Sequence, residues 1–298
     1  MTDTTTAPRS RSASLTIVTG LYVVAVAAAA AWLYLGPDTA YLWLDALIAD
    51  LVATAVVFAG SRIVHNSSCY DAYWSVIPPL LAVYWWLERE PGADGVRFAL
   101  LSVVLWLWAI RLTANWVYSW PGLHHEDWRY PMLREKNPKV ELPVDLMAIH
   151  VFPTLQVFAA MLPVYAVTRS ERAWGWLDVV ALVVGVGAVT LQLVADTQQH
   201  RFARTKQPGE SLVTGLWAWS RHPNYLGEIL MWFSLLLFGL SALPGAWWWQ
   251  VIGVVGMTAM FLGASIPMME QRSLERRPGY QDVIDSVPML LPRPPRRS

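Results

Sequence analysis

A carboxylate inside an apolar segment is the feature of this sequence that points most directly to chemistry. Glu228 ends the stretch SRHPNYLGE, positions 220–228, which leads into a long apolar run. A carboxylate at membrane depth is costly unless it faces a partner or a cavity, so it indicates a functional site. On a helix, Asn224 shares the face of Glu228, and Gly227 lacks a side chain where another group must come close. The alternative is a structural glutamate that a neighbouring helix neutralises.

A second polar group lies upstream, in the stretch DTQQHRFARTK. Asp196, His200 and Arg204 are spaced by four residues, so they share one face of a helix that continues out of the membrane. Arg201, Arg204 and Lys206 suit phosphate groups, and Asp196 suits a ribose hydroxyl or an amide. The spacing predicts a cytoplasmic site for a polyanion. The alternative is an ordinary cluster of basic residues beside a membrane span.

A third group opens with the stretch HNSSCYDAYWSVIPP. Asp71, with Tyr70 and Tyr73 beside it, precedes Pro78 and Pro79 in the same apolar segment. Prolines kink a helix and free carbonyl groups, and kinked helices often line cavities. This pattern favours a catalytic carboxyl. The alternative is an interfacial belt of tyrosine and tryptophan that Asp71 caps.

The stretch GLHHEDWRY, positions 122–130, places two histidines, two acids and an arginine within a few residues. His and carboxylate groups can bind several divalent ions. The spacing is not that of an HExxH motif, and the single cysteine, Cys69, excludes a zinc site built from several cysteines. We therefore expect no metal and predict an ion-paired loop that closes over a cofactor or contacts it.

The elements that must position these groups are membrane helices. Hydrophobic residues make up 55% of the chain, charged residues 15%, and the mean hydropathy is +0.36. The 18 tryptophans lie mostly near the ends of apolar runs, as in an aromatic belt. No β-barrel alternation is visible, so the predicted fold is an all-α polytopic membrane protein. The apolar runs long enough to span are residues 15–36, 43–63, 71–88, 97–115, 146–167, 174–196, 222–242 and 246–267.

The distribution of basic residues predicts the orientation of these eight helices. With the N-terminus inside, all but four of the 22 Lys and Arg residues fall on the cytoplasmic side. We therefore expect an integral protein of the plasma (inner) membrane with both termini cytoplasmic. Its net charge of zero argues against a nucleic-acid partner. The predicted parts are a cytoplasmic tail at 1–14, two helices at 15–63, the main membrane domain at 64–292 with cytoplasmic loops 116–145 and 197–221, and a flexible basic tail at 293–298.

Several motifs together resemble bacterial membrane proteins related to steroid 5α-reductase. They are GLWAWSRHPNYLGE, the DxxxHRFxR pattern before it, HEDWRY, and a P…LE…GY pattern near the end. The resemblance covers about residues 62–292, essentially all spans except the first. In animal steroid 5α-reductases, counterparts of KQPGE and NYLGE stand in the same order.

This resemblance implies a seven-helix core, with the helix at 15–36 as an addition. The core would hold NADPH on its cytoplasmic side and reduce a conjugated double bond of a lipophilic enone, steroid-like or another lipid. Asp71 stands seven residues before Pro78, as the family's catalytic carboxylate does. The resemblance implies catalytic roles for Asp71, Tyr70, Tyr73 and Glu228. It places Asn224 and Glu228 near the nicotinamide end of NADPH, and Asp196 and Arg204 at its adenosine and phosphate part. Together with the residue patterns, it predicts NADPH contacts for Asp196, His200, Arg201, Arg204, Arg221, His222, Asn224, Tyr225, Glu270 and Tyr280.

The expected reaction needs a donor beside the carbonyl oxygen of the enone, where negative charge develops. Asp71 can donate only if burial raises its pKa, whereas Tyr70 or Tyr73 can donate without that shift. The chain departs from the animal enzymes at three places. Trp108 stands where those enzymes have a catalytic tyrosine, three residues before an arginine. Asp71 replaces a glutamate, and a His-rich run near the end is absent. These departures bear on steroid specificity more than on the cofactor.

Two other classes remain open at this point. Membrane methyltransferases of the isoprenylcysteine carboxyl type, which use S-adenosylmethionine, share an RHPxY signature and a terminal Glu…Tyr pattern. Glu228 and the Asp196/Arg204 pair favour a larger, phosphate-bearing cofactor over S-adenosylmethionine. The other class is a non-catalytic protein that binds lipid. All three classes imply a lipophilic small molecule and membrane lipids as partners.

Overall fold

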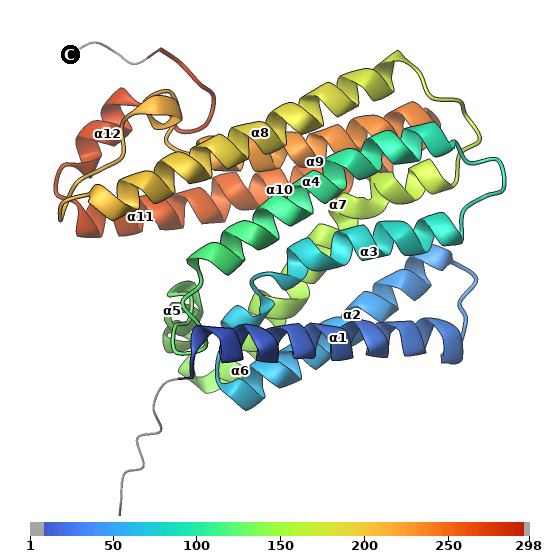
Figure 1. Cartoon of the computed structure of the whole chain (residues 1–298), viewed down its shortest axis with the longest axis horizontal. Helices are drawn as coiled ribbons and strands as arrows, with labels where there is room; N and C mark the ends of the chain where they lie inside the picture. Colours follow the sequence, from blue (N-terminus) through green and yellow to red (C-terminus); the bar gives the residue numbers. More distant parts are fainter. Residues whose placement is uncertain (1–8, 295–298) are drawn as a thin grey trace, which may run out of the picture. The chain divides into compact units, whose positions relative to one another are not determined.

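The computed structural model describes residues 9–294, whose regular elements are all helices, with no β-strand among them (Figure 1). The described chain divides into two compact units. The first comprises residues 9–85 and 112–158, and the second comprises 86–111 and 159–294. Three helices, α3, α4 and α7, contribute residues to both units.

The first unit is built around two long N-terminal helices that pack side by side, α1 and α2 (Figure 1). Small residues on facing sides let membrane helices approach closely, and Ala25 of α1 and Ala53 of α2 are fully buried here. Tyr70 and Tyr73 pack against the same cluster. The elements of this unit are α1 (Arg11–Leu35), α2 (Leu42–Val64), η1 (Ser67–Tyr70), most of α3 (Tyr73–Leu87), the end of α4 (Gly95–Ser119), α5 (Arg129–Lys136), η2 (Pro138–Val140), α6 (Glu141–Val144), η3 (Asp145–Val151) and the start of α7 (Phe152–Thr168).

The second unit is organised on two long helices, α8 and α9, which pack along each other (Figure 1). Its other elements surround this pair or follow it in the chain. The elements are the first part of α4, the end of α7, α8 (Trp176–Thr205), η4 (Gly215–Ala218), α9 (Pro223–Ala242), η5 (Pro244–Ala246), α10 (Trp247–Met260), η6 (Phe261–Ser265), α11 (Ile266–Arg276) and α12 (Tyr280–Ser286).

Glycines set the close approach of α8 and α9. A Cβ on Gly227 would lie 2.5 Å from Cγ of Gln192 and 2.9 Å from the carbonyl oxygen of Ala188. A Cβ on Gly185 would lie 2.5 Å from Oγ of Ser234. Both positions therefore need glycine for packing, and the sequence-based interpretation of Gly227 is confirmed.

The structure contains seven helical segments that are long and apolar enough to cross a membrane, within the described residues. They correspond to seven of the eight predicted spans. The eighth, predicted at 71–88, is α3, which has only 15 residues. At 1.5 Å per residue it extends about 22 Å, less than the ~30 Å of a bilayer core. It begins at Tyr73, two residues later than predicted, because the η1 turn ends at Tyr70 with Asp71 as its C-cap; Pro78 and Pro79 lie inside the helix.

The helices also extend beyond the predicted spans. Two of them, α4 and α8, continue to Ser119 and Thr205, so the predicted loops 116–145 and 197–221 begin later than expected. Residues 1–8 of the predicted N-terminal tail and 295–298 of the predicted basic tail lie outside the described residues. Within the described part, α1 begins at Arg11, and the backbone N–H of Arg293 donates to the carbonyl of Trp219.

Candidate functional site

Glu228 lies buried on α9 of the second unit, surrounded by hydrogen-bond donors. Its Oε1 accepts from the indole nitrogens of Trp108 and Trp232, both at 3.0 Å. Its Oε2 accepts from Nε2 of Gln192 at 2.6 Å. An indole nitrogen can only donate, so both carboxyl oxygens must accept, and this donor set fits the ionised carboxylate. Trp108 therefore holds Glu228 in place.

The counter-charge to Glu228 comes from Arg111 on α4. Nη1 of Arg111 donates to Oδ2 of Asp196 at 2.7 Å, and its Nη2 lies 3.6 Å from Oε2 of Glu228. All three side chains are at least nine-tenths buried. Asp196 thus lies in a carboxylate–arginine cluster with Glu228. We refer to Arg111, Asp196, Glu228 and Gln192 as the α4–α8–α9 polar cluster.

This cluster is not fully paired. Nε and Nη2 of Arg111 and Oε1 of Gln192 are buried, and no acceptor or donor within residues 9–294 is in hydrogen-bonding position for them. Buried polar groups are nearly always bonded in native proteins, so such atoms indicate a missing partner.

A second cluster forms where α9 begins. Nε of Arg221 donates to Oε1 of Glu270 at 2.7 Å, and Nε2 of His222 lies 3.0 Å from the same oxygen. Arg221 also donates to the carbonyls of Ile284 and Val287, so it fastens the C-terminal segment to the start of α9. Burial lowers the pKa of His222, against the opposing effect of Glu270.

Aromatic rings continue from His222 into the helical bundle of the second unit. The Tyr225 ring stacks on the His222 ring, with centroids 5.5 Å apart, and on the Phe261 ring at 4.9 Å. The structure thus brings together four predicted cofactor residues, Arg221, His222, Tyr225 and Glu270. Their side chains mainly contact one another.

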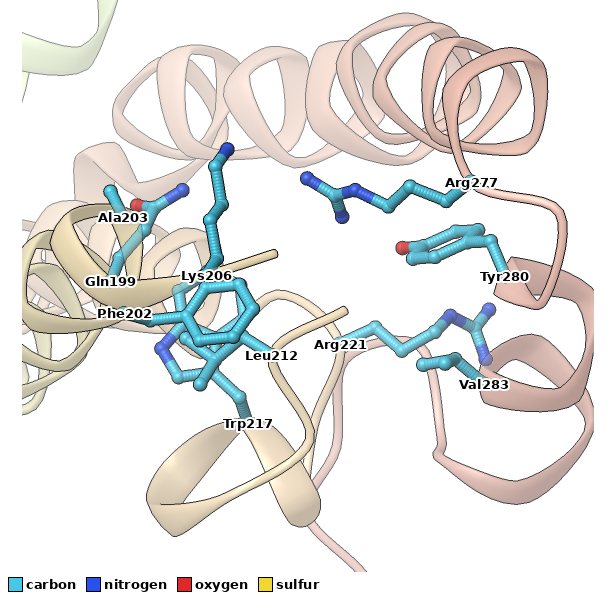
Figure 2. A pocket seen from close by; sticks show the side chains of 10 residues that line it. All are labelled: Gln199, Phe202, Ala203, Lys206, Leu212, Trp217, Arg221, Arg277, Tyr280 and Val283. Atoms are coloured by element: carbon cyan, nitrogen blue, oxygen red, sulfur yellow. The ribbon is translucent and has the colours of Figure 1, made fainter. Parts of the chain in front are cut away.

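The cavity beside this cluster is lined by cations. It has a volume of about 120 Å³. Figure 2 shows Lys206 entering from one side, and Arg277 and Tyr280 from the opposite side. Trp217 and Phe202 form an apolar wall. Burial raises the pKa of the Tyr280 hydroxyl, so it is a donor at neutral pH. The lining residues are Gln199, Phe202, Ala203, Lys206, Leu212, Trp217, Arg221, Arg277, Tyr280 and Val283.

Other predicted cofactor residues lie outside this lining. Asp196, His200 and Arg204 are all on α8, as predicted, but Asp196 is buried against Arg111 while Arg204 is exposed. Arg201 is also exposed. Oδ1 of Asn224 accepts from the backbone N–H of the next residue, at the first turn of α9. The structure therefore does not place these five side chains in a single site.

The first unit holds the predicted catalytic carboxyl. Asp71 follows η1, and the hydroxyl of Tyr130, at the start of α5, donates to its Oδ1 in a short hydrogen bond. Burial raises the pKa of Asp71 to about 7, and the Tyr130 hydrogen bond opposes this rise. Burial and the neighbouring Asp71 also hold the pKa of Tyr130 well above its usual value. Both groups can therefore carry a proton at neutral pH.

Tyr70 and Tyr73 have other partners. The Tyr70 hydroxyl lies 2.7 Å from Oγ1 of Thr154, and the Tyr73 hydroxyl donates to Oδ1 of Asp50 at 2.8 Å. Both tyrosines are fully buried, with their rings 5.2 Å apart. The structure thus directs their hydroxyls to the interior of the unit and gives Asp71 a different tyrosine.

The predicted ion-paired loop around HEDWRY is confirmed as ion-paired. Glu126 pairs with Arg134 and accepts from the backbone N–H of Ser67. Asp127 pairs with Arg129, and its backbone N–H donates to Ser68 at 2.9 Å. The loop therefore holds the segment that leads to Asp71. No cluster of three metal-ligating side chains occurs within the described part of the chain.

Sequence reasoning missed three participants in these sites. Tyr130 was part of a noted motif, yet nothing local linked it to Asp71, 59 positions away. Gln192 and Trp232 lie in apolar runs. A glutamine at membrane depth was a signal that could have been followed, because it needs a polar partner. Lys206 was assigned to phosphate groups, and only the fold shows that Arg277 lines the same cavity.

Comparison with known proteins places these residues in a defined family. An uncharacterized protein of Schizosaccharomyces pombe is 28% identical over 272 residues, covering 83% of this chain and 78% of that protein. No solved structure matches the chain. A family described as "Protein of unknown function (DUF1295)" matches residues 57–287, which include Asp71, Tyr130, the α4–α8–α9 polar cluster and the cationic cavity. The chain belongs to this DUF1295 family of membrane proteins.

Proposed function

We propose that this protein is an NADPH-dependent membrane reductase that transfers hydride to an activated carbon–carbon double bond of a lipophilic enone. The cationic cavity of the second unit is the observation that carries this proposal. Lys206, Arg277 and the Tyr280 hydroxyl all donate hydrogen bonds to anionic oxygens. Phosphate groups are the ligands that such a donor set favours, and an aromatic wall beside it suits a nucleotide base.

The residues present fit NADPH in charge and in chemistry. Arg277 offers a planar fork for a phosphate, and Lys206 offers a point charge. Arg221 has a different role, because its guanidinium is already bonded to Glu270 and to backbone carbonyls. Bound NADPH would supply hydride. We propose that the cavity faces the cytoplasm, where the predicted orientation places this end of α8, in the plasma membrane.

The Asp71–Tyr130 pair of the first unit suits the other half of the reaction. Reduction of an enone needs a donor for the carbonyl oxygen or for the adjacent carbon. The Tyr130 hydroxyl donates a hydrogen bond to the Asp71 carboxyl, whose pKa of about 7 lets it hold its own proton near neutral pH. The pair can therefore give a proton to the substrate and then be reprotonated. We assign proton donation to this pair and a packing role to Tyr70 and Tyr73.

The methyltransferase alternative rests on the RHPxY signature, and the structure gives that signature another role. Arg221 and His222 both bind Glu270 and so fix the start of α9. S-adenosylmethionine carries one carboxylate beside two positive groups and no phosphate, so Lys206 and Arg277 complement its charge less well than that of NADPH. A non-catalytic lipid-binding protein would need no such cluster of cations beside an aromatic wall.

Ligand binding to the purified, nanodisc-embedded protein tests the proposal. We expect NADPH, and not S-adenosylmethionine, to raise the melting temperature. Arg277→Gln and Lys206→Gln should each weaken NADPH binding by about 10- to 100-fold, because each removes a charge-assisted hydrogen bond. Arg276→Gln is the matched control, since Arg276 is exposed, adjacent in sequence and absent from the cavity lining. Stabilisation by S-adenosylmethionine alone would transfer the assignment to methyl transfer.

A further inference from the structure

The helix α8 has two opposite faces with different surroundings. One face is buried against α9 along the middle of the helix. This face continues to the cationic cavity, where Gln199, Phe202 and Lys206 line one wall (Figure 2). The opposite face is exposed along its apolar part, at Val183 and Val194. Because a helix turns about 100° per residue, residues of one face recur every three or four positions, and both faces can be followed to the end of the helix.

Arg201 and Arg204 continue the exposed face of α8. Arg201 stands about two turns after Val194, so the two residues lie on the same side of the helix. Arg204 follows Arg201 by one further turn of this stripe. Both side chains are exposed, and neither lines the cavity. The acidic residues of α8, Asp178 and Asp196, are both buried, so the exposed face carries positive charge and no carboxylate.

The length of α8 places these two arginines at the depth of lipid headgroups. Its 30 residues extend about 45 Å, which matches the ~40–45 Å of a bilayer with both headgroup layers. The helix begins at the exposed Trp176, and tryptophan is enriched at the membrane surface. Arg201 and Arg204 lie within about the last turn and a half, at the other end. The exposed face therefore passes from acyl chains to the phosphate layer at these residues.

The chemistry of the two side chains suits a phosphate group. A guanidinium group donates two parallel hydrogen bonds to phosphate oxygens from its planar fork. Residues three apart on a helix have Cβ atoms about 5–6 Å apart, so both arginines can reach one headgroup. The ammonium group of a zwitterionic headgroup would meet the same positive charge and oppose binding, whereas an anionic headgroup has no such group.

We propose that Arg201 and Arg204 bind the headgroup phosphate of an anionic phospholipid, in the leaflet that the predicted orientation makes cytoplasmic. The acyl chains of this lipid lie along the exposed apolar part of α8. The lipid would hold the last turn of the helix at the membrane surface. This inference is independent of the proposed reaction, and it gives the two arginines a ligand other than the NADPH that the sequence predicted.

Competition between two lipids tests this proposal. Nanodiscs hold the full chain in a mixture of phosphatidylglycerol, which is anionic, and phosphatidylcholine, which is zwitterionic. Native mass spectrometry of the released protein measures the ratio in which the two lipids stay bound. We expect wild-type protein to retain phosphatidylglycerol preferentially. Arg201→Gln and Arg204→Gln should each lower this preference by about 5-fold, because each removes one attraction to an anionic headgroup. Unchanged preference in both variants would overturn the proposal.

Lys206→Gln is the matched control. It removes one positive charge from the same end of α8, but from the face that lines the cavity. The lipid preference should stay at the wild-type level. An equal fall in Lys206→Gln and Arg201→Gln would mean that net charge alone attracts the lipid, and the proposed site on the exposed face would then be wrong.

Inorganic phosphate distinguishes a lipid headgroup from a free anion. It should leave the retained phosphatidylglycerol unchanged, because it lacks acyl chains that can contact the apolar part of the face. Displacement of the lipid by phosphate would assign the two arginines to a soluble anion instead.

NADPH provides the last comparison. Any rise in melting temperature that NADPH causes should persist in Arg204→Gln, since Arg204 lies outside the cavity lining. Loss of that rise with an unchanged lipid preference would return Arg204 to the cofactor and overturn the proposal. Wild-type protein that shows no rise would contradict the proposed function alone, because the lipid competition needs no NADPH.

Discussion

Two arginines on α4, Arg97 and Arg111, both contact side chains of α8 and α9. They differ in how many of their guanidinium nitrogens form hydrogen bonds. Arg97 donates to both oxygens of Asp178, at 2.8 and 3.2 Å, and to the carbonyls of Arg172 and Ala173. Ser241 of α9 completes this cluster, since it accepts from Arg97 and donates to Asp178. Every nitrogen of the Arg97 guanidinium is therefore used.

Arg111 also contacts α8 and α9, but fewer of its guanidinium nitrogens form hydrogen bonds. It makes one hydrogen bond to Asp196 and a longer ion pair to Glu228, and it leaves two nitrogens open. Both guanidinium groups are buried, so desolvation does not explain the difference. The closed cluster at Arg97 ties three helices together, whereas the cluster at Arg111 leaves hydrogen-bonding capacity unused.

The largest effect on stability should come from opening the closed cluster. Arg97→Gln leaves Asp178 buried without a counter-charge, and removing one partner of a buried pair costs about 3–5 kcal/mol. We expect a large loss of thermal stability, measured by unfolding in nanodiscs. Ser241→Ala is the comparison, and it should cost about 1–3 kcal/mol, because it removes one hydrogen-bonding partner of the cluster and leaves the Arg97–Asp178 ion pair in place. Equal losses in the two variants would contradict a dominant role of the ion pair.

A smaller effect should follow from changing the carboxylate of the open cluster. Glu228→Gln replaces one acceptor oxygen by an NH₂ group, which then faces the donors Trp108, Trp232 or Arg111. Donors that lose their acceptor cost about 1–3 kcal/mol, so we expect a moderate drop in stability together with weaker NADPH binding. Ser234→Ala on the same helix is the control, since Ser234 is buried and donates to a carbonyl outside the cluster. NADPH affinity that stays at the wild-type level in Glu228→Gln would show that Glu228 only supports the fold.

Sequence patterns predicted the helices well because a membrane span depends on local sequence alone, as an uninterrupted apolar run. The role of Gly227 was also local, since a small residue beside a buried polar one indicates close packing. The pattern misled at 71–88 in the length of the helix, because α3 covers Tyr73–Leu87, 15 residues, and is too short to cross a membrane.

Pairing across helices could not be predicted in the same way. Asp196 and Arg204 share a helical face, and this suggested a common ligand, but Arg111 on another helix holds Asp196. The partner of Asp71 is equally distant in sequence. The hydroxyl of Tyr70, the neighbouring residue, bonds to Thr154, while the hydroxyl of Tyr130, at the start of α5, reaches Asp71. Such long-range pairs depend on the arrangement of helices, which one sequence does not contain.

The smallest predicted effect concerns Asp71, a buried carboxyl that accepts its hydrogen bond from a tyrosine and not from an arginine. Burial raises the pKa of Asp71 from 3.8 to about 7, so the folded protein holds this proton more tightly than the unfolded chain does. Its favourable contribution to stability is therefore complete below about pH 4 and is lost as the pH rises through about 7. Asp127, Arg129 and Tyr130 face the same group.

Thermal unfolding between pH 4 and pH 8 tests this prediction. Asp71→Asn should remove the pH dependence of the melting temperature that the titration of Asp71 produces between about pH 4 and pH 7. Tyr130→Phe should move that dependence to higher pH, because it removes the hydrogen bond that favours the ionised carboxyl. Arg129 supplies the nearest positive charge and remains in both variants. A profile in Tyr130→Phe that coincides with wild type would mean that the hydroxyl does not interact with the carboxyl in solution, and proton donation by this pair would then lose its basis.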